Sequence, residues 1–129
     1  MKKLLPMLLA LALTGCTVGG TENVQDTYRQ ISMQEAMDMM ESEENYIILD
    51  VRREDEYAAG HSPGAILIPN ETIGDEEIPA LPDKDQLIMV YCRSGNRSKQ
   101  AAEKLVKLGY TEIVEFGGIN SWPGEVTTD

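Results

Sequence analysis

The chain alternates short apolar runs with segments of helical spacing. Residues 46–49 and 87–91 are apolar runs bounded by polar or turn residues, which is typical of strands buried on both faces. Residues 65–68 and 112–116 have a weaker pattern of the same kind and are also predicted to be strands. The pattern therefore predicts a sheet of short, mostly buried strands.

Two segments between these runs have the spacing of helices. Ser32 and Glu35 stand three positions apart, as in a capping box, and the apolar residues after Ser32 recur at helical spacing, which predicts a helix over residues 32–41. A second helix is predicted after the run at residues 87–91. Its apolar face includes Leu105, and Gly109 ends it.

The order of these elements predicts an α/β fold. Alternating strands and helices in one small domain favour a central parallel sheet with helices on both faces. A chain of 129 residues has room for a single domain, which we expect to cover residues 30–129. Residues 71–85 carry glycine and prolines among acidic residues, and they are predicted to be a surface loop.

The first residues have the pattern of an export signal. Lys2 and Lys3 precede an apolar run, residues 4–13, that is too short to span a bilayer as a helix. The tetrapeptide Leu-Thr-Gly-Cys at residues 13–16 resembles a lipobox, the motif at which bacterial lipoproteins are cleaved and acylated on the cysteine. Cys16 is therefore expected to carry lipid.

The lipoprotein prediction divides the N-terminal 29 residues into two parts. We expect residues 1–15 to be a lipoprotein signal peptide and residues 16–29 to be a flexible tether, because they hold too few apolar side chains to pack. The protein is then expected outside the cytoplasm, lipid-anchored to the bacterial cell membrane, with inner and outer membrane left open. Ordinary secretion without a lipid on Cys16 is the alternative.

The charge balance narrows the class of partner. The chain has 11 basic and 22 acidic residues and a net charge of −11. Nucleic acid is disfavoured as a partner by that sign. Repulsion from anionic lipid would also hold the domain off the membrane surface, so we expect membrane contact only through the lipid anchor.

If Cys16 carries lipid, Cys92 is the one remaining cysteine and has no partner for an intramolecular disulfide. It follows a predicted strand and precedes a predicted helix. Loop amides, the positive end of the helix dipole and the guanidinium groups of Arg93 and Arg97 would all favour its thiolate. Gly95 lets the loop turn tightly. A buried, inert cysteine beside a solvent-facing basic turn is the alternative.

At these residues the sequence resembles the rhodanese family. The family's active-site loop typically reads Cys-Arg-x-Gly-x-Arg or Thr, and the matching residues are Cys92, Arg93, Ser94, Gly95, Asn96 and Arg97. Segments that begin at Asp50, Glu56 and Gly60 follow the family's Asp-Val-Arg, Glu-Tyr and Gly-His-Ile-Pro-Gly-Ala patterns, with Ser62 in place of isoleucine. Two glycines before Trp122 resemble the closing segment. The resemblance spans about residues 31–122.

The resemblance implies a rhodanese-like fold and a sulfurtransferase. Cys92 would take a sulfane sulfur from an anionic donor such as thiosulfate, hold it as a persulfide, and pass it to a thiol or cyanide-like acceptor. No metal or organic cofactor is implied, and a monomer is expected.

The resemblance also assigns roles to the residues of the motifs. Arg93 and Arg97 would attract the donor and steady the persulfide. Ser94, Gly95 and Asn96 would complete the loop that binds it. Structural roles, with paired charges or hydrogen bonds, are expected of four further residues: Asp50, Arg52, Glu56 and His61.

Two other functions remain open. Phosphate or arsenate ester hydrolysis uses a similar loop, but the phosphatase loop has one more residue between cysteine and arginine than the four found here. The shorter loop should fit a sulfur atom better than a phosphoryl group. The second alternative is an exported redox-sensing or partner-docking module, in which Cys92 forms mixed disulfides without sulfur turnover.

Overall fold

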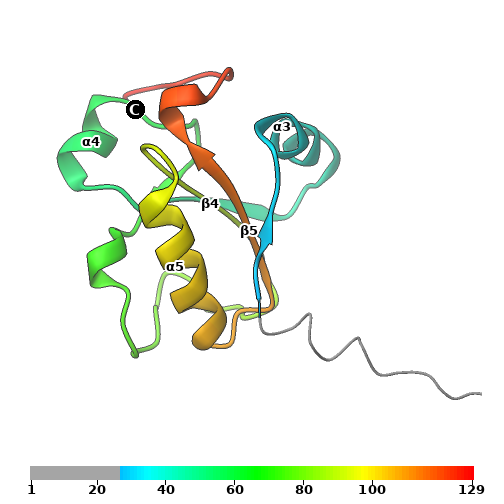
Figure 1. Cartoon of the computed structure of the whole chain (residues 1–129), viewed down its shortest axis with the longest axis vertical. Helices are drawn as coiled ribbons and strands as arrows, with labels where there is room; N and C mark the ends of the chain where they lie inside the picture. Colours follow the sequence, from blue (N-terminus) through cyan, green and yellow to red (C-terminus); the bar gives the residue numbers. More distant parts are fainter. Residues whose placement is uncertain (1–26) are drawn as a thin grey trace, which may run out of the picture.

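The structure, a computed structural model, describes residues 27–129; the predicted signal peptide, Cys16 and most of the expected tether lie outside the described residues. Five strands form one sheet in the order β1-β5-β4-β2-β3, and every neighbouring pair is parallel (Figure 1). The elements are β1 (Arg29–Gln30), α3 (Met33–Ser42), β2 (Tyr46–Asp50), α4 (Glu54–Ala59), β3 (Ile66–Leu67), the 3-10 helix η3 (Asn70–Thr72), β4 (Leu87–Cys92), α5 (Asn96–Lys107), β5 (Glu112–Gly118) and the 3-10 helix η4 (Ile119–Ser121).

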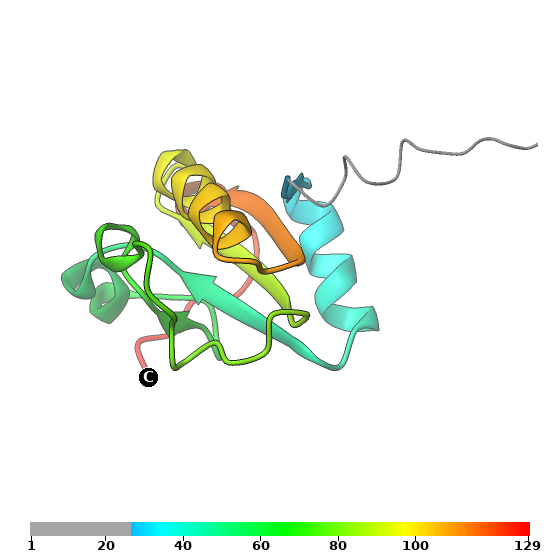
Figure 2. The same ribbon diagram turned by 90° about the horizontal axis from the view of Figure 1, so that it is seen from below.

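Helices cover both faces of this sheet, as Figures 1 and 2 show. On one face, Ala101 and Leu105 of α5 are fully buried against Leu49 and Val90 of the central strands. On the other face, Ala36 of α3 packs with apolar side chains of β4 and β5. The predicted α/β fold, with a central parallel sheet and helices on both faces in a single domain, is confirmed.

The capping box predicted at the start of α3 is present. The Ser32 hydroxyl accepts a hydrogen bond from the Glu35 amide at 3.0 Å, and the Glu35 carboxylate accepts one from the Ser32 amide at 2.9 Å. These two bonds satisfy amide groups that the first turn of a helix leaves without partners. Within residues 27–129, no helix is long and apolar enough to cross a membrane.

The fold begins slightly before the predicted boundary. β1 starts at Arg29, inside the segment expected to be a tether, and pairs with Val114 and Glu115 of β5. Tyr28, one residue earlier, packs against the core beneath α5. A strand of two residues is too short to show an alternating pattern, so β1 could not be predicted from the sequence.

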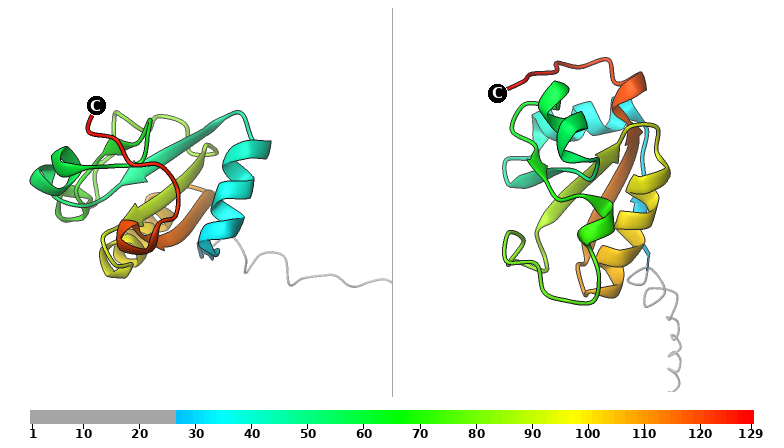
Figure 3. Two further views of the ribbon diagram at one scale, coloured as in Figure 1. Left: turned by 90° about the horizontal axis from the view of Figure 1, so that it is seen from above. Right: turned by 90° about the vertical axis from the view of Figure 1, so that its left-hand side faces the viewer.

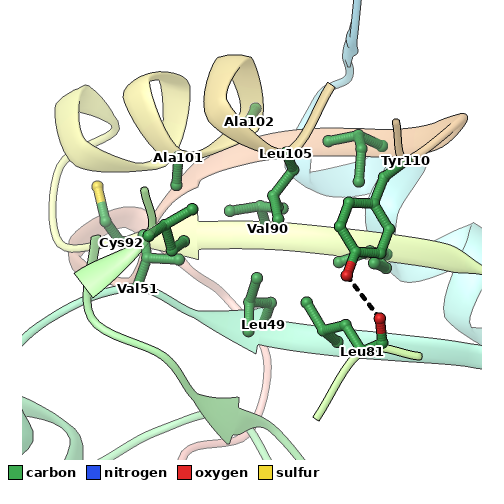
Figure 4. Close-up of a cluster of buried hydrophobic side chains, with 12 residues drawn as sticks. Leu49, Val51, Leu81, Val90, Cys92, Ala101, Ala102, Leu105 and Tyr110 are labelled. Atoms are coloured by element: carbon green, nitrogen blue, oxygen red, sulfur yellow. Dashed lines mark hydrogen bonds between the residues drawn. The ribbon is translucent and has the colours of Figure 1, made fainter. Parts of the chain in front are cut away.

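The segment predicted to be a surface loop also contributes to the core. Ile73 and Leu81 are buried, with 3% and 1% of their surface exposed. The Tyr110 hydroxyl donates a hydrogen bond of 2.5 Å to the Leu81 carbonyl, which fastens the segment to the sheet (Figure 4). Residues 71–85 therefore cover an edge of the core through Ile73 and Leu81, while most of their other residues are exposed.

Because all strands are parallel, their carboxyl ends lie at one edge of the sheet. α4, η4 and the C-terminal segment gather at that edge (Figure 3). The C-terminal segment is fixed by two backbone hydrogen bonds of 2.8 Å between His61 and Thr127. Polar side chains that follow β2, β4 and β5 are thereby brought together, as expected for the functional edge of such a sheet.

Candidate active site

Cys92 is the last residue of β4, and only 1% of its surface is exposed. Figure 4 shows it at the end of the apolar cluster, with its sulfur pointing toward the loop that leads into α5. Val90 pairs with Glu115 but Cys92 pairs with Gly118, so β5 holds one extra residue at this point. Such bulges commonly re-aim side chains beside active sites.

The loop after Cys92 turns back over the sulfur. The Gly95 amide donates a hydrogen bond of 3.0 Å to the Cys92 Sγ. Gly95 has a φ of +109°, a left-handed conformation that a side chain would strain. Asn96 then begins α5, so the sulfur lies at the positive end of a twelve-residue helix.

Several contacts act on the pKa of the Cys92 thiol. Burial alone would raise it, but the hydrogen bond with the Ser98 hydroxyl and those from the amides of Ser98, Gly95 and Ser94 outweigh burial. The net result is a pKa below the usual value for cysteine. The thiolate is therefore a larger fraction of Cys92 at neutral pH than of an ordinary buried cysteine.

The two arginines of the loop are placed differently. Arg97 forms a bidentate ion pair with Glu56 of α4, with N–O distances of 2.8 and 3.0 Å. These hydrogen bonds, opposed by burial, lower the pKa of Glu56 to about 2. Arg93 is exposed, and its guanidinium has no ion pair within residues 27–129. Arg93 is thus the loop arginine that is free to meet an anion.

Asp50 and Arg52 form a buried ion pair behind the loop. Arg52 Nη2 lies 2.7 Å from Asp50 Oδ2 and also donates to the Gly60 carbonyl at 2.6 Å. The Tyr91 hydroxyl, next to Cys92 in the chain, donates to Asp50 Oδ2 at 2.7 Å. The pair therefore joins the turn after β2 to the end of β4, away from the sulfur itself.

His61 also lies behind the site. Its ring stacks on Tyr57, with centroids 3.7 Å apart, and its Nδ1 lies 2.8 Å from the Tyr57 carbonyl. Only 3% of its surface is exposed, and it has no contact with Cys92 among those described. The four residues expected to be structural thus divide into one pair behind the loop, one carboxylate that holds Arg97, and one stacked histidine.

The structure adds two site residues that the sequence did not reveal. Ser98 Oγ lies 3.4 Å from Cys92 Sγ and 2.5 Å from a carboxylate oxygen of Glu115. Ser98 stands directly after the loop motif, and Glu115 is an acid inside an otherwise apolar strand run. That charge in a buried run was the one signal in the sequence that pointed to Glu115.

The arrangement is suited to nucleophilic sulfur chemistry. A thiol with lowered pKa, inward-facing amides and a nearby guanidinium can attack an electrophilic sulfur and hold the anionic product. In the part of the chain that the structure describes, no three His, Cys, Asp or Glu side chains lie together as metal ligands.

A model of the rhodanese-like domain matches residues 32–125. The chain belongs to the rhodanese-like family. It is 39% identical over 71 residues to the thiosulfate sulfurtransferase PspE of Escherichia coli, a match that covers 55% of this chain and 68% of that protein. It is 33% identical over 99 residues to the putative sulfur carrier protein YrkF of Bacillus subtilis, covering 74% of this chain and 51% of that one.

The fold agrees with solved rhodanese structures. A rhodanese-related protein from Thermoplasma volcanium superposes with a TM-score of 0.66 at 30% identity, over 79% of this chain and all of that one. The names of the relatives support sulfur transfer in general as the activity of this rhodanese.

Proposed function

We propose that this rhodanese is a thiosulfate sulfurtransferase that works through a persulfide on Cys92. The observation that carries the proposal is the Gly95 amide aimed at a Cys92 sulfur whose pKa is lowered. The relative PspE, which is named as a thiosulfate sulfurtransferase, supports the choice of donor.

The proposed reaction has two halves. The Cys92 thiolate attacks the sulfane sulfur of thiosulfate, a new S–S bond forms, and the donor's S–S bond breaks as sulfite leaves with the electron pair. A thiol or cyanide-like acceptor then attacks the outer sulfur of the persulfide, and the thiolate is restored. The amides of Ser94, Gly95 and Ser98, which act on Cys92, would stabilise the anionic sulfur in both states.

We propose different roles for the two arginines of the loop motif, because only Arg97 forms an ion pair among the described residues. The Arg93 side chain is exposed and forms no ion pair in the described part of the chain, so we assign the attraction of the anionic donor to it. Arg97 is held by Glu56 and would steady the loop around the persulfide. Arg93→Ala should raise KM for thiosulfate, whereas Arg97→Ala should mainly lower kcat.

Formation of thiocyanate from thiosulfate and cyanide tests the proposal. We expect Cys92→Ser to abolish the activity and Cys16→Ser, the matched control on the other cysteine, to retain it. Wild-type protein that forms a stable adduct with glutathione disulfide but no thiocyanate would contradict the proposal and favour a redox role. Hydrolysis of an aryl phosphate that is lost in Cys92→Ser would favour the phosphatase alternative.

For the location of the protein we propose a lipid anchor on Cys16, outside the cytoplasm of a bacterial cell. The support is the tetrapeptide at residues 13–16, which resembles a lipobox. Cys16→Ala should move the protein out of the membrane fraction, and mass spectrometry of the wild type should find a diacylglyceryl group on Cys16. Membrane-fraction protein without that group would contradict the anchor.

A further inference from the structure

Glu115 is a buried acid that the proposed reaction leaves without a task. It lies on β5, with 2% of its surface exposed, and forms no ion pair within residues 27–129. Its carboxylate accepts hydrogen bonds from the Gly117 amide at 2.9 Å and from Gln30 Nε2 at 3.4 Å. Burying a charged carboxylate costs free energy unless hydrogen bonds or opposite charges compensate for the lost water. With no ion pair among the described residues, Glu115 depends on its hydrogen bonds, including the one from Ser98.

Ser98 connects this carboxylate to the reactive sulfur. Its Oγ lies 2.5 Å from Glu115 Oε2 and 3.4 Å from Cys92 Sγ, and Ser98 itself is fully buried. A hydroxyl has one proton to donate and two lone pairs to accept. The Gly95 carbonyl, at 3.0 Å, is a second acceptor for that proton, but the charged carboxylate is closer and stronger.

When the Ser98 proton points to Glu115, a lone pair of the same oxygen faces the Cys92 thiol. The three groups then form a continuous chain from S–H through O–H to carboxylate. Both links are direct, since each distance is within hydrogen-bond range, and every member is buried.

We propose that Ser98 relays the thiol proton of Cys92 to Glu115 when the attacking thiolate forms. The S–H bond breaks as the proton moves to Ser98 Oγ, the original Ser98 O–H bond breaks as its proton moves to Glu115 Oε2, and the electron pair stays on sulfur. Nothing is oxidised or reduced. Ser98 touches the reacting atom, whereas Glu115 acts through it as a positioning residue.

Charge explains why the relay is useful. A thiolate and a carboxylate buried together would repel each other, so passing the thiol proton to Glu115 removes that repulsion as the thiolate forms. The other charged or titratable groups that act on the pair are few. Arg97 interacts with the charge of Cys92, and Tyr28 of β1 has its pKa raised first by burial and then by Glu115 and by Glu103 of α5.

The test is the pH profile of Cys92 alkylation by iodoacetamide in the full-length chain carrying Cys16→Ser, so that one cysteine reacts. Two groups sharing a proton titrate in two macroscopic steps. The logarithm of the rate should therefore rise to a plateau and then rise again. Glu115→Gln should leave a single step, and Ser98→Ala should lower the rate at the plateau, because the thiolate then loses the hydroxyl that connects it to Glu115. Glu112→Gln, an exposed acid on the same strand, should keep both.

A single step in the parent chain would overturn the relay, and this result does not require either variant to fold. Two steps that persist in folded Glu115→Gln would overturn it as well. The relay would explain how the attacking thiolate forms, and it rests on the proposed sulfurtransferase function. Alkylation uses no sulfur donor, so a failure of the relay is distinguishable from a failure of sulfur transfer.

Discussion

Individual contacts determine what each charged residue near Cys92 can do. Glu56 and Arg97 are 41 positions apart in sequence and yet form the bidentate pair that fixes the loop to α4. The sequence indicated that Glu56 would be paired, but it could not name the partner. For the same reason it gave Arg93 and Arg97 the same two roles, whereas only Arg97 has an ion pair among the described residues.

The Glu56–Arg97 pair makes stability sensitive to acid. The folded-state pKa of Glu56 is about 2, below the ordinary 4.5, so its contribution is complete above about pH 4.5 and is lost as the pH falls through about 2. The free energy of unfolding of the wild type, measured by urea titration, should fall as the pH is lowered through this range. Glu56→Gln should remove that part of the pH dependence. Glu54→Gln, an exposed acid on the same helix, is the control. Parallel curves for wild type and Glu56→Gln would contradict the assignment.

The Asp50–Arg52 pair should matter for stability more than any exposed pair. Asp50→Ala leaves the Arg52 guanidinium buried and uncompensated and also removes the acceptor of the Tyr91 hydroxyl. We expect the free energy of unfolding to fall by about 3–5 kcal/mol. Denaturant titration measures it, and Asp55→Ala, which breaks an exposed pair with Arg53, should change it little. Equal effects of the two substitutions would show that the buried pair is not structural.

At the level of elements, the site depends on where β4 and β5 end. The backbone just after β5 contacts the loop that follows Cys92, because the amide of Asn120 in η4 donates a hydrogen bond of 3.1 Å to the Arg93 carbonyl. The clear apolar runs at residues 46–49 and 87–91 predicted β2 and β4 well, since strands buried on both faces leave a clear pattern, and the weaker runs at residues 65–68 and 112–116 correspond to β3 and β5. β1 and α4 were not predicted. A strand of two residues and a helix of six residues with none buried leave almost no pattern in the sequence.

Gly118, the last residue of β5, should tolerate no side chain. A Cβ there would lie 2.1 Å from the Arg93 carbonyl oxygen, a backbone atom that cannot move without moving the loop. Gly118→Ala should lower the free energy of unfolding by about 3 kcal/mol and reduce sulfur transfer strongly. In Gly74→Ala, the control, the new Cβ meets nothing within 4 Å, so stability and activity should be kept. A fully active Gly118→Ala would contradict the close approach of β5 to the loop.

For the whole molecule, the sequence predicted the architecture better than the chemistry of the buried site. Apolar runs and helical spacing were sufficient for a parallel sheet with two covered faces, and the cysteine loop could be found by its motif. The Ser98–Glu115 contact could not, because it joins residues from different elements across the bulge at the end of β5. Long-range polar contacts carry no local periodicity.

The persulfide on Cys92 can be tested by intact mass spectrometry of the full-length protein before and after thiosulfate. We expect a mass gain of one sulfur atom that cyanide removes and that Cys92→Ser lacks. If the wild type gains no sulfur while remaining folded, or if Cys92→Ser gains it as well, Cys92 does not carry the persulfide and the proposed mechanism is wrong.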